Sequence, residues 1–300
     1  MKIVKLKQLG TLLKITFNKW YNRDPFRESA VIAYNAIFSL PGLLVVVVTF
    51  AGYFFGADVV SNRLNSQIAE AMGAETANQI QEMIIAANKN SDSWLATLLG
   101  FVTILIGATG VFVQMQKSLN TIWEVKATTA KSGIWMFLKT RLFSFGLIMS
   151  IAFLLLVSLV LSSLLSAIGT WTISRTSETW LILFQILNFI FSLVIITVLF
   201  AFMFKILPDA KIKWNLVWIG AFFTGLLFVI GKSTLGLYFG KANPGSGYGA
   251  AGSVVLILLW TSYSSMIVFF GAEFTKAYSD YYYGEISASE NAVKQQEIIV

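Results

Sequence analysis

The sequence contains no cysteine and no histidine among its 300 residues, and only 12% of its side chains are charged. The absence of cysteine excludes a disulfide framework and thiol chemistry. The absence of histidine removes the commonest general base and metal ligand. A soluble domain carries about 25% charged residues, so this chain has too few to cover an ordinary water-exposed surface. The composition therefore favours a membrane domain.

Six long apolar runs account for this composition. A run of about 20 apolar residues is long enough to cross a bilayer as a helix. We therefore predict an all-α, polytopic membrane protein with six transmembrane helices, at about residues 29–55, 94–114, 142–168, 180–204, 214–240 and 248–276. We expect three parts in the chain: a cytosolic basic helix at 1–27, a transmembrane domain at 28–278 with an outer helical cap at 56–92, and a polar, partly disordered cytosolic tail at 279–300.

Lysine and arginine are concentrated on one side of these spans. Of the 22 basic residues, 17 fall in segments on the amino-terminal side, four fall on the other side, and Lys232 lies within the fifth span. Basic loops remain in the cytosol, so both termini are predicted to be cytosolic. The basic residues are spread over short segments beside the spans and do not gather on one folded face, which argues against nucleic acid as a partner.

The amino-terminal 27 residues combine seven basic side chains with apolar residues at helical spacing, from Ile3 to Trp20. This pattern is typical of an amphipathic helix that lies on an anionic membrane surface. Two interpretations remain open. The helix could serve as an anchor that orients the first span, or as a regulatory or lipid-sensing element.

Two places are expected to interrupt the helices. Pro41 and Gly42 lie inside the first span, where proline removes a backbone hydrogen bond and predicts a kink. A glycine-rich hinge lies between the fifth and sixth spans and includes Gly247, Gly249 and Gly252. Small residues there either allow close helix packing or form a broken helix whose amino terminus faces an anionic ligand.

Polar residues in or beside the apolar runs form the candidate site. At a rise of 1.5 Å per residue, most fall in the cytosolic half, and Lys232 lies near the outer headgroups. If the second helix continues, Gln116, Asn120 and Glu124 share one stripe. Our hypothesis is a polar cavity open toward the cytosol and inner leaflet, with a substrate pathway along Asn35, Ser39, Gln116, Lys117, Asn120, Lys205, Asp209, Lys232 and Glu273.

Structural roles compete with this hypothesis for several of these residues. Asn35 and Ser39 could form interhelical hydrogen bonds, which are common in membrane bundles. Lys232 could extend its amine to the outer surface. Glu273 could be an interfacial carboxylate paired with Lys276, one turn further on, or with the basic connectors.

Short motifs in a fixed order link the chain to known proteins. In sequence order they are Ala33-Tyr34, Phe38-Ser39-Leu40-Pro41, Gln116, Leu119-Asn120, Ile122-Trp123, Val125, Leu207-Pro208-Asp209, Trp214, Gly220-Ala221, Tyr238, Tyr248-Gly249-Ala250-Ala251-Gly252-Ser253, Leu259-Trp260 and Gly271-Ala272-Glu273. Over about residues 28–276, the chain thereby resembles the YihY/BrkB family of bacterial inner-membrane proteins, formerly mislabelled ribonuclease BN. Gly42 departs from the family, which often has proline there.

The resemblance implies six spans in the bacterial cytoplasmic (inner) membrane and no settled activity. Members have been linked to serum resistance, and others are suggested to move lipids or ions. We expect a transporter of an anionic lipid, a lipid-linked intermediate or an ion. The sequence has no G-x-x-x-x-G-K-[ST] loop, so ATP is not expected to drive it. The alternative is a non-transporting envelope scaffold that uses segment 56–92.

Ribonuclease activity is disfavoured. Metal-assisted phosphodiester cleavage needs clustered carboxylates or histidines, whereas the acids of the cytosolic loops are scattered and histidine is absent. We therefore expect no enzymatic activity, no metal and no cofactor. The expected partners are membrane lipids and a small ion or anionic lipid substrate, and the sequence is compatible with a homo-oligomer.

Overall fold

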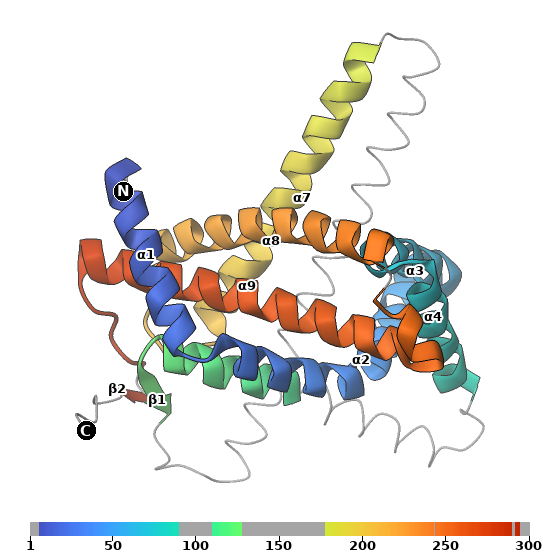
Figure 1. The fold of residues 1–300 in the computed structure, drawn as a ribbon, viewed down its shortest axis with the longest axis horizontal. Helices are drawn as coiled ribbons and strands as arrows, with labels where there is room; N and C mark the ends of the chain where they lie inside the picture. Colours follow the sequence, from blue (N-terminus) through green and yellow to red (C-terminus); the bar gives the residue numbers. More distant parts are fainter. Residues whose placement is uncertain (1–5, 90–109, 128–177, 243, 290–291, 295–300) are drawn as a thin grey trace.

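The computed structural model describes residues 6–89, 110–127, 178–242, 244–289 and 292–294. These residues are almost wholly helical (Figure 1). Two short strands, β1 (Val125–Ala127) and β2 (Ala292–Lys294), pair in antiparallel fashion. The helices are α1 (Leu6–Asn22), α2 (Pro25–Phe55), α3 (Ala57–Met72), α4 (Ala74–Lys89), an unlabelled helix at 110–122, α7 (Glu178–Ile206), α8 (Trp214–Ala242), the 3-10 helix η2 (Ser246–Ala251) and α9 (Gly252–Tyr283).

Three described helices are long and apolar enough to cross a membrane: residues 189–206 of α7, all of α8 and all of α9. They coincide with the predicted fourth, fifth and sixth spans. α2 covers the predicted first span as one continuous helix through Pro41 and Gly42, and the kink there stays a prediction. Most of the predicted second span and all of the third lie outside the described residues.

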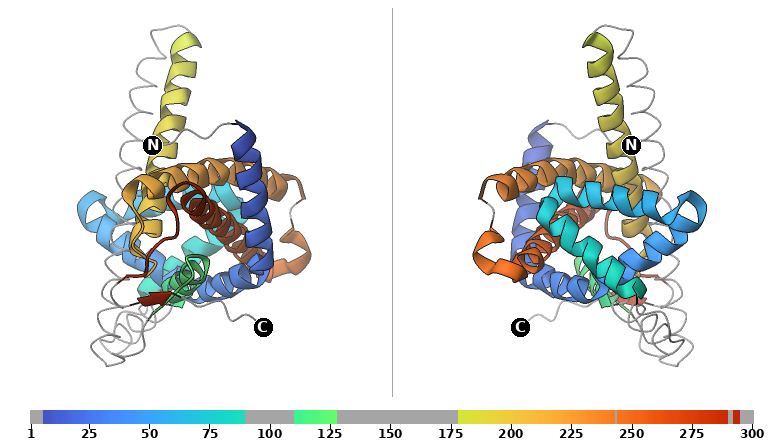
Figure 2. Two further views of the ribbon diagram at one scale, coloured as in Figure 1. Left: turned by 90° about the vertical axis from the view of Figure 1, so that its left-hand side faces the viewer. Right: turned by 90° about the vertical axis from the view of Figure 1, so that its right-hand side faces the viewer.

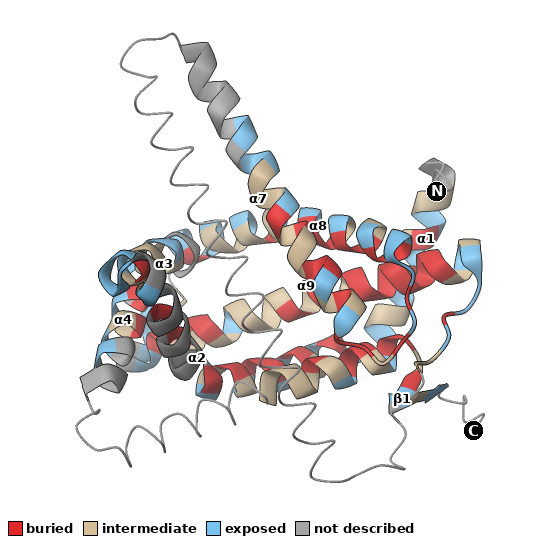
Figure 3. Cartoon of the chain, turned by 180° about the vertical axis from the view of Figure 1, so that it is seen from behind, coloured by how far each residue is buried: buried red, intermediate tan, exposed pale blue. Residues whose placement is uncertain are grey.

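Helix α9 lies at the centre of the bundle, in contact with α1, α2 and α8 (Figure 1). Its nine residues from Gly271 to Ser279 are all buried (Figure 3). A helix buried on every side must be enclosed by other elements. α1 provides part of this enclosure, because Leu12 and Thr16 are fully buried and Trp20 donates a hydrogen bond to the Met266 carbonyl at 3.2 Å. The apolar face of the basic amino-terminal helix is therefore used for packing within the protein.

The crossing of α8 and α9 is fixed by two reciprocal glycine–threonine contacts. A Cβ atom on Gly220 of α8 would lie 1.7 Å from Thr275 Oγ1, and one on Gly271 of α9 would lie 1.8 Å from Thr224 Oγ1. Each threonine hydroxyl donates to a carbonyl of its own helix at 2.7 Å, so no polar group is left unpaired. Small residues let membrane helices approach closely, and here only glycine fits.

Helices α3 and α4 lie across one end of the bundle (Figure 2). The chain turns into α3 at Gly56 and into α4 at Gly73, with φ angles of 89° and 94° that glycine adopts readily. The segment predicted to be a helical cap is thus a pair of helices packed on α2 and α9. A buried apolar cluster joins them: Leu44, Val48, Val60, Ile80 and Ile257.

The η2 helix connects α8 to α9 at the same end (Figure 1). A Cβ atom on Gly252 would lie 2.6 Å from the carbonyl oxygen of Gly245, so backbone contact explains the need for glycine at this position. Gly247 has open space around it, and the surroundings of Gly249 lie outside the described side chains. The role of this connection as a hinge stays a prediction.

The opposite end of the bundle holds α1, β1 and β2 (Figure 1). α9 continues to Tyr283, five residues beyond the predicted domain boundary. The chain then folds back over the connector that follows α7. The Ser289 amide donates to the Asp209 carbonyl, and the Lys211 amide donates to the Ser287 carbonyl, each at 2.9 Å. The first part of the predicted tail is therefore folded against the helical domain.

Candidate functional site

The turn between α1 and α2 positions two arginines, of which Arg23 contacts α9. Asp24 adopts left-handed backbone angles, φ 57° and ψ 56°, which aspartate tolerates better than most residues. Pro25 follows as the first residue of α2, where its fixed φ suits a helix start. This turn places Arg23 beside α9 and Arg27 in the first turn of α2.

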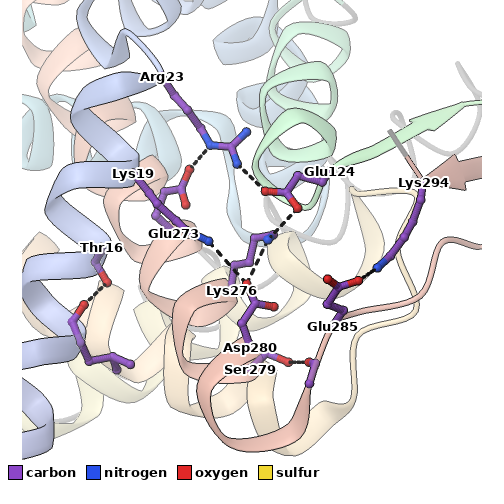
Figure 4. Close-up of polar contacts among 12 residues, drawn as sticks. Thr16, Lys19, Arg23, Glu124, Glu273, Lys276, Ser279, Asp280, Glu285 and Lys294 are labelled. Carbon is purple, nitrogen blue, oxygen red and sulfur yellow. Dashed lines mark hydrogen bonds and ion pairs between the residues drawn. The ribbon is translucent and has the colours of Figure 1, made fainter. Parts of the chain in front are cut away.

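Six charged side chains, called here the charged cluster, meet between this turn, α9 and the turn after the helix at 110–122 (Figure 4). Arg23 Nε lies 2.6 Å from Glu273 Oε1, and Arg23 Nη2 lies 2.9 Å from Glu124 Oε1. Lys276 Nζ lies 3.0 Å from both Glu124 Oε2 and Asp280 Oδ2. Lys19 completes the cluster, with its Nζ 3.6 Å from Asp280 Oδ2. Three bases therefore face three acids, and the cluster is neutral when all six are ionised.

Glu273 is the most deeply buried member, with a side chain only 1% exposed. Although Arg23 Nε is close, its N–H does not point at the carboxylate, and neither Glu273 oxygen accepts a hydrogen bond within the described parts of the chain. Burying a charged group without hydrogen bonds is costly. The pair with Lys276 that we considered from the sequence is not formed. Arg23, remote in sequence, is the partner, and Lys276 instead joins Glu124 to Asp280.

Glu124 reaches the cluster because the helix at 110–122 ends before it. Its φ of 56° turns the chain, so the expected stripe with Gln116 and Asn120 is wrong at this last position. Burial opposes the ionisation of Glu124, but the hydrogen bond from Lys276 and the charges of Lys276 and Arg23 outweigh it. Together they hold the pKa of Glu124 below its usual value.

A cavity of about 380 Å³ lies next to the charged cluster, between the α1–α2 turn, the helix at 110–122 and α9. Its lining includes Arg23, Arg27, Glu28, Ser118 and Glu273. Ligand sites commonly enclose about 300–1,000 Å³, so the cavity is large enough for a small polar group. Glu28 is held in place by Ser118 Oγ, which donates to Glu28 Oε2 at 2.7 Å.

A second polar set lies on the opposite face of the helix at 110–122 from the residues that line the cavity. Asn120 Nδ2 donates to Asp209 Oδ2 at 2.8 Å, and the Asp209 amide donates back to Asn120 Oδ1 at 2.8 Å. Gln116 Nε2 lies 3.3 Å from the same carboxylate oxygen. The structure therefore brings together three of the predicted pathway residues, which join the connector after α7 to this helix.

The other predicted pathway residues lie apart from the cavity. Asn35 and Ser39 donate to the carbonyls of Val31 and Ala36 in their own helix, at 2.8 and 3.1 Å. The Lys205 ammonium donates to the Ile212 carbonyl and lies over the Trp214 ring. The two remaining residues do not line the cavity either: Lys117, which is exposed, and Lys232, which is partly exposed on α8.

Sequence reasoning placed Glu273 in the site but missed Arg23, Arg27 and Glu28. Arg23 was counted among the basic residues that orient the first span, and nothing local separates it from them. The Asp24-Pro25 pair that follows signals a turn, which is the feature that could have set it apart. No group of three or more Asp or Glu side chains within the described ranges could hold a metal ion.

Three helices long and apolar enough to cross a membrane define a helical integral membrane protein. The family model for virulence factor BrkB matches residues 16–296, and the chain belongs to this family, which confirms the resemblance drawn from its motifs. No solved structure matches the chain.

Several proteins of known sequence are similar to it. The UPF0761 membrane proteins of Saccharophagus degradans and Rhodospirillum centenum are 24% and 26% identical, over 93% and 94% of this chain. The chain spans 62% and 61% of their lengths. The ribonuclease-like protein YfkH of Bacillus subtilis is 22% identical over 88% of this chain and 93% of its own.

Proposed function

We propose that the protein is a multi-pass transporter of the bacterial inner membrane that moves an anionic lipid, a lipid-linked intermediate or an ion without ATP. The observation that carries the proposal is the cavity, with Arg23 and Arg27 on its walls and Glu273 buried inside a helix long enough to span a membrane. Charges inside membrane spans are costly and mark substrate or ion pathways. Guanidinium groups suit oxyanions because their N–H groups are paired and planar.

The proposal includes six spans with both termini in the cytosol, so that the cavity opens toward the cytosol. The distribution of basic residues supports this orientation. The arrangement of the helices is compatible with it, since α3, α4 and η2 gather at one end and α1 and β2 at the other (Figures 1 and 2). The proposal assigns no enzymatic reaction and no cofactor. Its partners are membrane lipids, the anionic substrate and, where the chain self-associates, further copies of itself.

Transport by purified protein in liposomes tests this proposal. The wild-type protein is expected to move fluorescent phosphatidylglycerol between leaflets, or to carry anions into the lumen. Glu273→Gln is expected to abolish the movement. Glu82→Gln removes a carboxylate from the exposed surface of α4, far from the cavity lining, and is expected to leave it unchanged.

The scaffold alternative makes the opposite prediction. Its binding surface would be the α3–α4 pair, and transport would play no part. Folded wild-type protein that moves neither lipid nor anion would contradict the transport proposal and favour the scaffold. Movement that Glu273→Gln and Glu82→Gln affect equally would remove the cavity from the pathway.

A further inference from the structure

One acid of the charged cluster is poorly supported in its ionised form. Glu124 accepts a hydrogen bond from Arg23 and forms an ion pair with Lys276. Its side chain is 41% exposed. Glu273 is 1% exposed, and both of its oxygens lack a hydrogen-bond donor among the described residues. Burial and missing hydrogen bonds both disfavour a carboxylate. Glu273 is therefore the member that takes up a proton most easily.

Arg23 is the group that responds when Glu273 is protonated. Its Nε lies 2.6 Å from the carboxylate, and its side chain also lines the cavity. Protonation leaves three bases facing two carboxylates in the charged cluster. Among the charged residues that line the cavity, protonation changes the balance from two bases against three acids to two against two. It therefore removes the negative charge nearest to Arg23, whose guanidinium can bind an oxyanion.

The start of α2 adds to the attraction for an anion. Asp24 forms no side-chain hydrogen bond that caps this helix, and Pro25 carries no N–H. The first turn of a helix presents unpaired amides and the positive end of the helix dipole. Pro25 and Arg27 line the cavity, so this positive end borders the same space as Arg23. Asp24 also lines it, and its carboxylate lies 3.8 Å from Arg27 and offsets part of that charge.

We propose that binding of an oxyanion in this cavity is coupled to protonation of Glu273. Ionised Glu273 pairs with Arg23 Nε, and protonation of Glu273 frees this nitrogen for a phosphate- or sulfate-like group. Arg23 Nη1 and Nη2 stay on the Thr121 carbonyl and on Glu124. Coupling between two sites is reciprocal, so an oxyanion at Arg23 favours the protonated carboxyl, and one proton enters with each anion. The inference rests on the proposed function only in taking this cavity as the substrate site.

The other charged groups around Glu273 keep a partner when it is protonated. Arg23 retains Glu124, Lys276 retains Glu124 and Asp280, and Lys19 retains Asp280. The exposed Arg27 lies 3.7 Å from Glu28. The charged groups beside Glu273 are Lys19 and Arg23 from α1 and the turn after it, Glu124 from the turn after the helix at 110–122, and Lys276 and Asp280 from α9. Asp24, Arg27 and Glu28 share the lining of the cavity with it.

Calorimetry on the full chain in detergent tests the coupling. The two probes are sulfate and dihexanoyl phosphatidylglycerol, whose own charges do not change between about pH 6 and 8. Titrations in buffers of different ionisation enthalpy measure the protons taken up with each anion. Sulfate binding alone identifies a free oxyanion as the ligand, and binding of the lipid alone identifies a headgroup.

The wild-type chain is expected to take up about one proton per anion bound, and its affinity is expected to fall up to about tenfold per pH unit as Glu273 ionises. Glu273→Gln is expected to bind the anion with no proton uptake and no pH dependence. Glu124→Gln is the matched control, because it removes the other acid that pairs with Arg23 but does not line the cavity. It is expected to retain proton uptake.

Two results would overturn the inference. Anion binding by the wild-type chain without proton uptake would show that the two events are independent. Unchanged uptake in Glu273→Gln would show that another group takes up the proton. Either result leaves the transport proposal standing, because transport is scored separately in liposomes. Failure of the folded wild-type chain to bind either probe would remove the oxyanion site, and the liposome assay would still decide whether transport occurs.

Discussion

Two turns of α9 face two very different neighbours. On one face, Gly271 and Thr275 interlock with Thr224 and Gly220 of α8, and the contact is purely steric. On another, Glu273 and Lys276 belong to the charged cluster. Lys276 pairs with two carboxylates, and Glu273 lies between Arg23 and the cavity. The α9 residues of both regions are buried. They differ in how many alternative partners their side chains have: the side chains at the helix crossing have one packing arrangement, and those of the charged cluster have several partners of opposite charge.

This difference separates a fixed frame from a region that can change. The threonine hydroxyls of the helix crossing donate hydrogen bonds within their own helices. The four residues of the crossing therefore offer no ionisable group that a change of pH could titrate and no free donor that a ligand could bind. The charged cluster depends on ionisation, and loss of one charge redistributes the remaining contacts. The crossing therefore fixes the position of α9, while the charged side chains on α9 can change partners.

The largest expected effect comes from removing the base of the buried pair. Arg23→Met leaves the Glu273 carboxylate buried without its ion pair, and loss of one partner of a buried pair costs about 3–5 kcal/mol. Because the Arg23 side chain is 25% exposed, we expect about 3 kcal/mol, the lower end of that range. Thermal unfolding in detergent measures it.

Two further variants test the cause of this loss. The double variant Arg23→Met/Glu273→Leu removes the orphaned charge and is expected to recover most of the stability. Arg27→Met removes an arginine whose side chain is 70% exposed, and we expect less than about 0.5 kcal/mol. A double variant no more stable than Arg23→Met alone would show that arginine packing, and not the charge of Glu273, sets the cost.

The next largest effect is expected at the helix crossing. Gly271→Ala places a methyl group 1.8 Å from Thr224 Oγ1, so the helices must separate, and overpacking of this kind costs about 1–3 kcal/mol. The matched control is Gly240→Ala in α8, where a Cβ atom meets nothing within 4 Å. It is expected to be neutral or slightly stabilising, because alanine favours helix over glycine. Equal effects of the two substitutions on unfolding would contradict the steric account.

Local pattern was enough to predict the helices but not the contacts between them. The apolar runs at 180–204, 214–240 and 248–276 predicted α7, α8 and α9 to within a few residues at most ends, because length and hydrophobicity alone define such helices. The helix crossing was missed. Both spans carry a G-x-x-x-T pattern, at 220–224 and 271–275, but sequence alone does not show which small residues face each other.

The charged cluster shows the same limit at longer range. Glu273 stood out because a carboxylate in an apolar run is unusual, whereas its partner Arg23 lies 250 residues earlier among seven similar basic residues. Only the turn at Asp24 and the packing of α1 on α9 select that arginine. Asn120 and Asp209 were both predicted in the pathway, yet their mutual hydrogen bonds depend on a connector whose position the sequence does not specify.

The smallest expected effect is at the exposed edge of the charged cluster and depends on pH. Although burial opposes its ionisation, contacts with Lys276 and Arg23 hold the pKa of Glu124 below its usual value of 4.5. Because the pKa is lower in the folded chain than in the unfolded one, ionised Glu124 stabilises the fold above about pH 4.5, and this contribution is lost as pH falls through the lower, folded-state pKa.

Solvent screens a side chain that is 41% exposed, so we expect Glu124→Gln to cost less than about 1 kcal/mol at pH 7. Denaturant unfolding of both proteins, with Glu82→Gln as the control for loss of a carboxylate, is expected to show the difference disappearing once the pH falls below the folded-state pKa of Glu124. A difference that persists there would mean that the shape of the Glu124 side chain matters and that its charge does not.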